Sequence, residues 1–76
     1  MGLEDNHFIV KIEIKDSIKG ERFHHLMEHA PEIKTILHKR GKEILFNIDP
    51  NLVLQVGDIL VVEGELEPLR KLYARF

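Results

Sequence analysis

Histidine is the residue type in this chain with the clearest metal-binding chemistry. The 76 residues include five histidines, and three of them, His24, His25 and His29, lie close together. In a helix, His25 and His29 would share one face, because residues four apart are neighbours there. Two imidazoles at this spacing can bind zinc or nickel, but a closed structural site needs four ligands, and Glu28 and His24 face the same way only in part. The alternative is a solvated polar face.

Catalytic chemistry has less support. General acid–base catalysis needs titratable groups that converge in a pocket, whereas the carboxylates here are scattered singly along the chain. Neither Ser17 nor Thr35 is paired with a histidine as nucleophile and base. Asp16, Asp49 and Asp58 are typical of turns and caps. The glycines never form a Gly-x-Gly-x-x-Gly pattern, which excludes a dinucleotide site of that kind. We therefore predict a non-catalytic protein.

Charge and composition exclude further classes. Eleven basic and thirteen acidic residues give a formal charge of −2 with no block of one sign, so nucleic acid is not a predicted partner. The chain has no cysteine, which excludes disulfides and thiolate metal sites. The longest apolar run, Ile59 to Val62, is far shorter than the roughly 20 residues that cross a bilayer, and the N-terminus has no signal-peptide pattern. We expect no direct membrane insertion.

The elements that position these residues follow from the hydrophobic pattern. Residues 1–6 lack periodicity and are predicted to be a disordered lead, so the expected domain is 7–76. From His7 the apolar residues alternate, which predicts a strand with one buried face. Pro31 ends a short helical stripe, and Gly41 suits a hairpin turn. His38 falls at a strand end, where partial exposure is expected. The remaining predicted elements are a helix at 21–29, strands at 33–38, 42–46 and 59–63, and a helix at 66–76.

The fold class follows from this order of elements. One strand, a helix, three strands and a second helix, without any internal repeat, predict an α+β domain in which both helices pack on a small mixed four-stranded sheet, in the order β-α-β-β-β-α. The unbroken apolar run Ile59 to Val62 predicts a central strand that is covered on both faces.

Two turns bracket the segment that leads into this central strand. Pro50 presets a turn angle, and Asp49 and Asn51 can bond nearby backbone groups. Gly57 can adopt positive φ, and Asp58 can accept a hydrogen bond from a backbone amide. We interpret Asp49, Pro50, Gly57 and Asp58 as structural turn residues.

The same segment carries a family resemblance. The pattern Asp-Pro-(x)3-Leu-(x)2-Gly-Asp-(x)-Leu-(x)-Val-(x)-Gly, here Asp49 to Gly64, resembles the C-terminal regulatory domain of TrkA-type potassium-uptake proteins, called TrkA-C or RCK_C. The extended segment Ile9 to Ile14, the basic hairpin Lys39 to Lys42 and the closing segment Leu66 to Leu72 fit the same family. Glu21 departs from it, because a lysine or arginine usually follows the glycine at this point.

The resemblance implies a regulatory function. It implies a domain that dimerises, senses a small ligand such as cyclic di-AMP or a divalent cation, and passes its state to a potassium channel or transporter subunit. The parent protein would then be cytoplasmic at the inner face of the membrane. The implied pocket lies between paired domains, near the first helix and the basic hairpin. Its predicted ligand residues are Arg40, as the anion-binding fork, with Lys39, Asn47 and His25.

Three alternatives stay open. The hairpin Lys39 to Lys42 can be an ordinary charged turn, the domain can be a subunit-assembly module without a ligand, and His25 with His29 can form a divalent-metal sensor. A homodimer is expected through an edge strand or through Ile9 and its neighbours, because so small a core gains from pairing. We also expect Arg40→Ala to leave folding nearly intact, since Arg40 is assigned to the ligand surface rather than to the turn at Gly57.

Overall fold

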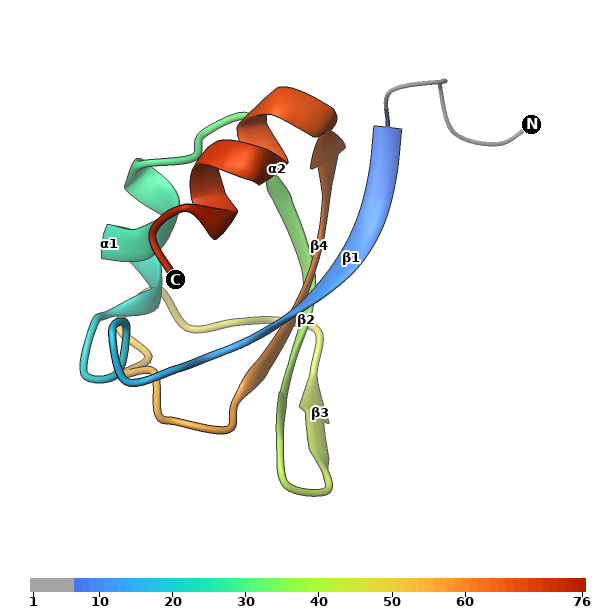
Figure 1. Ribbon diagram of the computed structural model, residues 1–76. Coiled ribbons are helices and arrows are strands. Elements are labelled where there is room, and N and C mark those ends of the chain that lie inside the picture. The colour runs from blue at the N-terminus through green and yellow to red at the C-terminus, as the bar shows by residue number, and fades with distance from the viewer. Residues whose placement is uncertain (1–6) are drawn as a thin grey trace.

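The computed structural model describes residues 7–76, so the predicted disordered lead lies outside the described residues. Its elements are β1 (His7–Glu13), α1 (Phe23–Glu28), β2 (Lys34–Arg40), β3 (Glu43–Leu45), β4 (Ile59–Glu65) and α2 (Leu66–Tyr73) (Figure 1). The predicted α+β class and the order of elements are confirmed. Over residues 7–76, no helix is long and apolar enough to cross a membrane.

The sheet has the strand order β1-β4-β2-β3, and each of its neighbouring pairs is antiparallel. The prediction of a mixed sheet is therefore wrong. A strand-helix-strand connection usually makes parallel neighbours, but here β4 lies between β1 and β2 and runs opposite to both. Val62 of β4 pairs with Val10 on one side and with Thr35 on the other. The central position predicted for β4 is confirmed.

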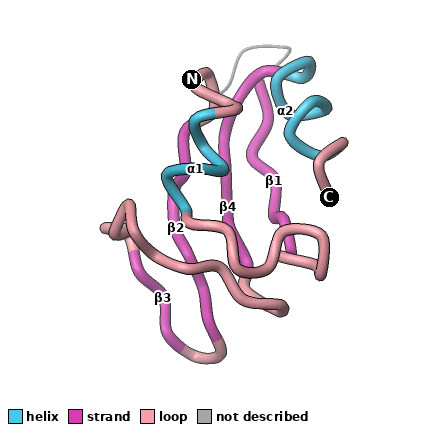
Figure 2. Tube along the Cα trace, turned by 90° about the vertical axis from the view of Figure 1, so that its left-hand side faces the viewer, coloured by secondary structure: helices cyan, strands magenta, loops and turns pink. Residues whose placement is uncertain are grey.

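One face of the sheet carries the core. Both helices and the loop between β3 and β4 lie over this inner face, as the turned view in Figure 2 shows for α1 and the loop. The residues of β4 alternate between the faces: Leu60 and Val62 are buried, whereas Ile59 and Val61 are half-buried. The prediction that β4 is covered on both faces is therefore wrong for the single chain. The core residues are Ile12, Ile14, Ile18, Leu26, Ala30, Ile33, Leu54, Leu60, Val62, Leu69 and Leu72.

The first helix begins two residues later than predicted, at Phe23. Arg22 is extended and forms an isolated antiparallel bridge with Val53. Leu54 forms two backbone hydrogen bonds with the same segment. Its N–H donates to the Glu21 carbonyl, and its carbonyl accepts from the Gly20 N–H. These backbone bonds hold residues 20–22 against the long loop, so they cannot adopt helical angles.

The chain turns at residues 50–51 and again at residues 56–57. The N–H of Asn51 donates to Asp49 Oδ1 at 2.8 Å, and the N–H of Leu52 donates to the Asp49 carbonyl at 2.9 Å. Gly57 has φ of +92° and Gly41 has φ of +60°. Both angles lie in the region that glycine adopts without steric cost.

Candidate functional site

Arg40 and Asp58 form the shortest side-chain hydrogen bond among the described residues. Arg40 Nε donates to Asp58 Oδ1 at 2.9 Å, and Arg40 Nη2 donates to Asp58 Oδ2 at 2.7 Å. This two-bond geometry is the one that a planar guanidinium makes best with a carboxylate. Nη2 also donates to the Val53 carbonyl at 2.9 Å, and the N–H of Gln55 donates to Asp58 Oδ2 at 3.1 Å. Arg40 thereby joins β2 to the loop and to the turn before β4.

The ion pair fixes the charge state of Asp58. The Asp58 side chain is only 2% exposed, and burial by itself would raise the pKa of its carboxyl. Hydrogen bonds from the Arg40 guanidinium and the Gln55 amide, with His38 beside them, outweigh burial and lower the pKa of Asp58 to about 2. The same bond to Asp58 raises the pKa of Arg40. Both groups are charged at neutral pH.

His38 lies in the core next to this pair, so the expectation of partial exposure is wrong. Its side chain is 2% exposed, with Nε2 3.1 Å from Asp58 Oδ2. Neither ring nitrogen has a partner in good hydrogen-bond geometry within residues 7–76. The reason for its burial is that β2 continues to Arg40, which makes His38 an inner-face residue opposite Leu60.

The expected independence of Arg40 from the turn at Gly57 is also wrong. Asp58 follows Gly57 directly, and its carboxylate is the partner of Arg40. Arg40 is thus part of the fold, although its side chain remains 35% exposed and its Nη1 makes none of these bonds. Lys39 points to the opposite, outer face, where it pairs with Ile59 and Ile44 across the sheet.

A groove lies between α1 and the segment that follows β3, beside the start of β2, whereas the basic hairpin lies at the other end of β2. The groove has a volume of about 300 Å³. We call it the α1 groove, and its lining residues are Phe23, Met27, Ile33, Thr35, Phe46 and Ile48. Phe46 is 72% exposed, so a large aromatic surface is available at its rim. Thr35 supplies a hydroxyl oxygen that is buried and has no hydrogen-bond partner in the described part of the chain.

The predicted ligand residues are distributed unevenly around the α1 groove. Asn47 is exposed and lies between Phe46 and Ile48, both of which line the groove. His25 lies about 200° around the helix from Phe23, hence on the other side of α1. There its Nδ1 is 3.4 Å from Glu21 Oε1. The structure therefore brings Asn47 to the groove, but not His25.

The predicted metal ligands lie close to each other. The rings of His25 and His29 pack edge to face with centroids 5.4 Å apart. Residues 7–76 contain no group of three or more histidine, cysteine, aspartate or glutamate side chains arranged to hold a metal ion. His24 instead contacts Glu28, with 3.3 Å between Nδ1 and Oε2.

Sequence reasoning did not identify the lining of the α1 groove. The helical pattern predicts core-facing positions for Phe23 and Met27, and the strand pattern places Thr35 on one face with Ile33. A large aromatic residue, Phe46, directly after a short strand was the available signal, because exposed aromatic surface is common at binding sites.

Comparisons with known proteins identify the fold. No family model and no curated protein matches the chain. It is similar to the RCK C domain of the potassium transport protein KtrA, solved in complex with c-di-AMP: the TM-score is 0.82, with 28% identity over 95% of this chain and 86% of that one. The NAD-bound GsuK channel gives a TM-score of 0.74 and 12% identity over 93% of this chain and 14% of that one. For the separate GsuK RCK domain the TM-score is 0.70, with 13% identity over 93% of this chain and 16% of that one.

The GsuK structures show likeness of fold alone, and the KtrA domain adds similarity of sequence over nearly the whole chain. The antiparallel four-stranded sheet and the two helices agree with this comparison. The chain is an RCK_C (TrkA-C)-like domain.

Proposed function

We propose that this domain is a non-catalytic regulatory module that senses an anionic nucleotide, in the first place c-di-AMP, for a potassium channel or transport protein. The observation that carries the proposal is the α1 groove, found in a domain similar to one solved in complex with c-di-AMP. The parent protein would hold the domain on the cytoplasmic side, next to its membrane subunit.

The chemistry of the α1 groove suits a nucleobase. Phe46 and Ile48 supply apolar surface, the hydroxyl of Thr35 has no partner in the described chain, and Asn47 adds an amide between them. An aromatic ring gains from stacking on a base, by about 1–3 kcal/mol in single-stranded complexes. Arg40 supplies positive charge for phosphate at the hairpin end of β2, because its Nη1 makes none of the bonds to Asp58 and Val53 and its side chain is partly exposed.

The size of the α1 groove favours a dimeric sensor. A volume of about 300 Å³ is at the low end for ligand pockets, which usually hold a whole small molecule in a single cavity. A cyclic dinucleotide consists of two identical halves. Two copies of the domain around a two-fold axis would each bind one half, because such an interface repeats the same surface.

The test is a thermal-shift and calorimetric titration with c-di-AMP. A ligand at 100 times its dissociation constant adds about 2.7 kcal/mol to the unfolding free energy. We expect this stabilisation in the wild type, its loss in Phe46→Asp, and its retention in Val56→Asp. Val56 is a matched control because it is 54% exposed and does not line the α1 groove.

Two outcomes would redirect the proposal. Absence of any response to c-di-AMP, other nucleotides and divalent cations would favour the subunit-assembly module. Stabilisation by zinc or nickel that disappears in the His25→Ala, His29→Ala double variant would favour the metal sensor, since those rings lie next to each other.

A further inference from the structure

β1 forms one edge of the sheet and leaves half of its backbone groups without a strand partner. The order β1-β4-β2-β3 puts β4 on one side of β1 and no described strand on the other. The N–H of Ile14 donates to the Asp58 carbonyl, so the even-numbered residues of β1 direct their backbone groups toward β4. Because the direction alternates in an antiparallel ladder, Ile9 and Lys11 direct theirs to the open edge.

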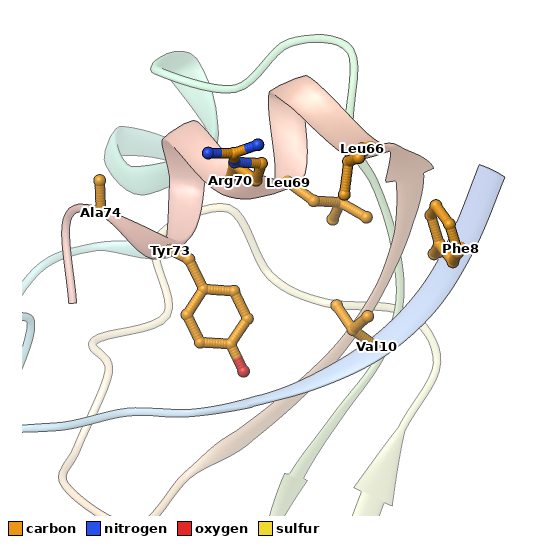
Figure 3. A pocket seen from close by; sticks show the side chains of 7 residues that line it. All are labelled: Phe8, Val10, Leu66, Leu69, Arg70, Tyr73 and Ala74. Carbon is orange, nitrogen blue, oxygen red and sulfur yellow. The ribbon is translucent and has the colours of Figure 1, made fainter. Parts of the chain in front are cut away.

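An apolar groove follows this open edge. It has a volume of about 550 Å³ and lies between β1 and α2. We call it the β1–α2 groove, and its lining residues are Phe8, Val10, Leu66, Leu69, Arg70, Tyr73 and Ala74 (Figure 3). Three of its apolar side chains, Phe8, Leu66 and Tyr73, remain 41%, 42% and 52% exposed.

We propose that the β1–α2 groove binds an extended, acidic peptide segment of a partner protein as an added strand beside β1. A peptide residue opposite Ile9 would exchange two backbone hydrogen bonds with it, and its two neighbours would then point toward the groove between Phe8, Val10 and α2. The recognised chemistry is an apolar residue, any residue and a second apolar residue, with a carboxylate on the α2 side. This inference is independent of the proposed nucleotide site, because the α1 groove adjoins β2 and the segment after β3, not β1.

The positive charge of the β1–α2 groove favours a carboxylate in the bound peptide. Arg70 is the one charged residue among its lining residues. Arg70 Nη1 is 3.6 Å from Glu67 Oε2, but both side chains are about 70% exposed, so this surface pair is weak and easily exchanged. A peptide carboxylate can therefore replace Glu67 as the partner of Arg70.

The geometry limits the occupant to a short segment. The hydroxyl of Tyr73 donates to the Lys11 carbonyl at 3.3 Å and covers the open edge at that point (Figure 3 shows the hydroxyl pointing to β1). From Leu66 to Ala74, α2 rises about 12 Å, which an extended chain spans with about four residues. Pairing with the whole of β1 from a second copy would displace the Tyr73 hydroxyl from the Lys11 carbonyl, whereas a short peptide opposite Ile9 leaves that hydrogen bond in place.

The first experiment selects peptides from a displayed library of random heptapeptides, with the 76-residue chain as bait. Leu66→Glu is the blocked variant, because it places a negative charge in the groove at an exposed position. We expect the wild type, compared with this variant, to enrich apolar-x-apolar sequences with an adjacent acidic residue or C-terminal carboxylate. Failure to enrich any such sequence over the blocked variant would overturn the proposal.

The second experiment titrates the best selected peptide into labelled protein by amide NMR. We expect amide shifts centred on Ile9. The affinity should be at least about tenfold weaker for Leu66→Glu and for a peptide N-methylated opposite Ile9, and should stay within about twofold for the exposed control Val56→Glu. Equal affinity of the N-methylated peptide would exclude strand addition. Shifts of β1 amides that depend on protein concentration without peptide, and vanish in Leu66→Glu, would identify a second copy as the occupant and overturn the peptide.

Discussion

At the scale of residues, the pairing of Arg40 with Asp58 connects structure to the predicted ligand surface. Arg40 contributes two hydrogen bonds to a carboxylate that is almost completely buried, and one to the loop at Val53. Arg40 thereby stabilises the turn before β4 while about one third of its side chain stays exposed. The ion pair therefore has to be tested for stability before any loss of ligand binding is interpreted.

We expect Arg40→Ala to lower the unfolding free energy by about 2 kcal/mol, because it leaves the buried Asp58 charge without its partner. The value is below that of fully buried pairs, since Arg40 is about one-third exposed and water can replace it in part. Lys39→Ala is the control, and as a surface change it should stay within about 0.5 kcal/mol. Urea unfolding of both variants measures this, and equal stability of the two would show that Arg40 is free for ligand.

The lowered pKa of Asp58 predicts acid sensitivity. Its folded pKa of about 2 is below the ordinary value of 3.8, so its contribution to stability is fully present above about pH 5 and is lost as the pH falls through 3.8 toward 2. This difference between the folded and the ordinary pKa corresponds to about 2 kcal/mol of unfolding free energy. Urea titrations from pH 6 to pH 2 should show that the unfolding free energies of wild type and Asp58→Asn converge below pH 4. A constant difference over this range would contradict the assigned shift.

Gly57 allows a test of backbone conformation alone, because a β-carbon added there would meet no neighbouring atom. At φ of +92° an added β-carbon is strained, although no atom lies within 4 Å of its position. We expect Gly57→Ala to lower the unfolding free energy by about 1 kcal/mol or more. Gly64→Ala is the matched control, because it has no positive φ and its β-carbon would meet Ile33 at an ordinary 3.5 Å. Thermal melts showing a larger loss for Gly64→Ala would contradict this account.

At the scale of elements, α2 is anchored by one face only. Leu69 and Leu72 are 4% and 2% exposed, whereas Leu66 and Tyr73 extend toward the β1–α2 groove and stay exposed. A helix of eight residues is too short to be stable alone and depends on this packing. The same division makes the exposed residues available for binding.

Truncation of α2 side chains should separate these roles. We expect Leu72→Ala to lower the unfolding free energy by about 2–5 kcal/mol, as for other buried leucines, and Leu66→Ala by less than about 1 kcal/mol. Denaturant unfolding of both variants measures the difference. Similar losses at the two positions would mean that Leu66 is covered in solution, for example by a second copy.

At the scale of the whole molecule, the outer face of the sheet and the small α1 groove both favour self-association. Ile9 and Ile44 are 51% and 50% exposed on that outer face, and a chain of this length buries only about 60% of the surface that its unfolded form exposes. We expect sedimentation equilibrium at micromolar concentration to show a dimer. A single 8.9 kDa species over the whole range would exclude it.

Local chemistry was determined by the sequence itself. The Asp49-Pro50-Asn51 turn, the positive φ of Gly41 and Gly57, and the order of strands and helices all depend on residues adjacent in the chain. The resemblance over Asp49 to Gly64 predicted an RCK_C-like domain from the same local pattern, and the similarity of fold and sequence to the KtrA domain agrees with it.

Only the tertiary structure decided which distant residues meet. Insertion of β4 between β1 and β2 makes the sheet wholly antiparallel, and this order of strands is not encoded in any single segment. The insertion of β4 also buries His38 opposite Leu60. Arg40 and Asp58 are 18 residues apart, and their contact depends on that insertion. Both grooves also form between segments distant in sequence, so their shapes depend on packing rather than on local propensity.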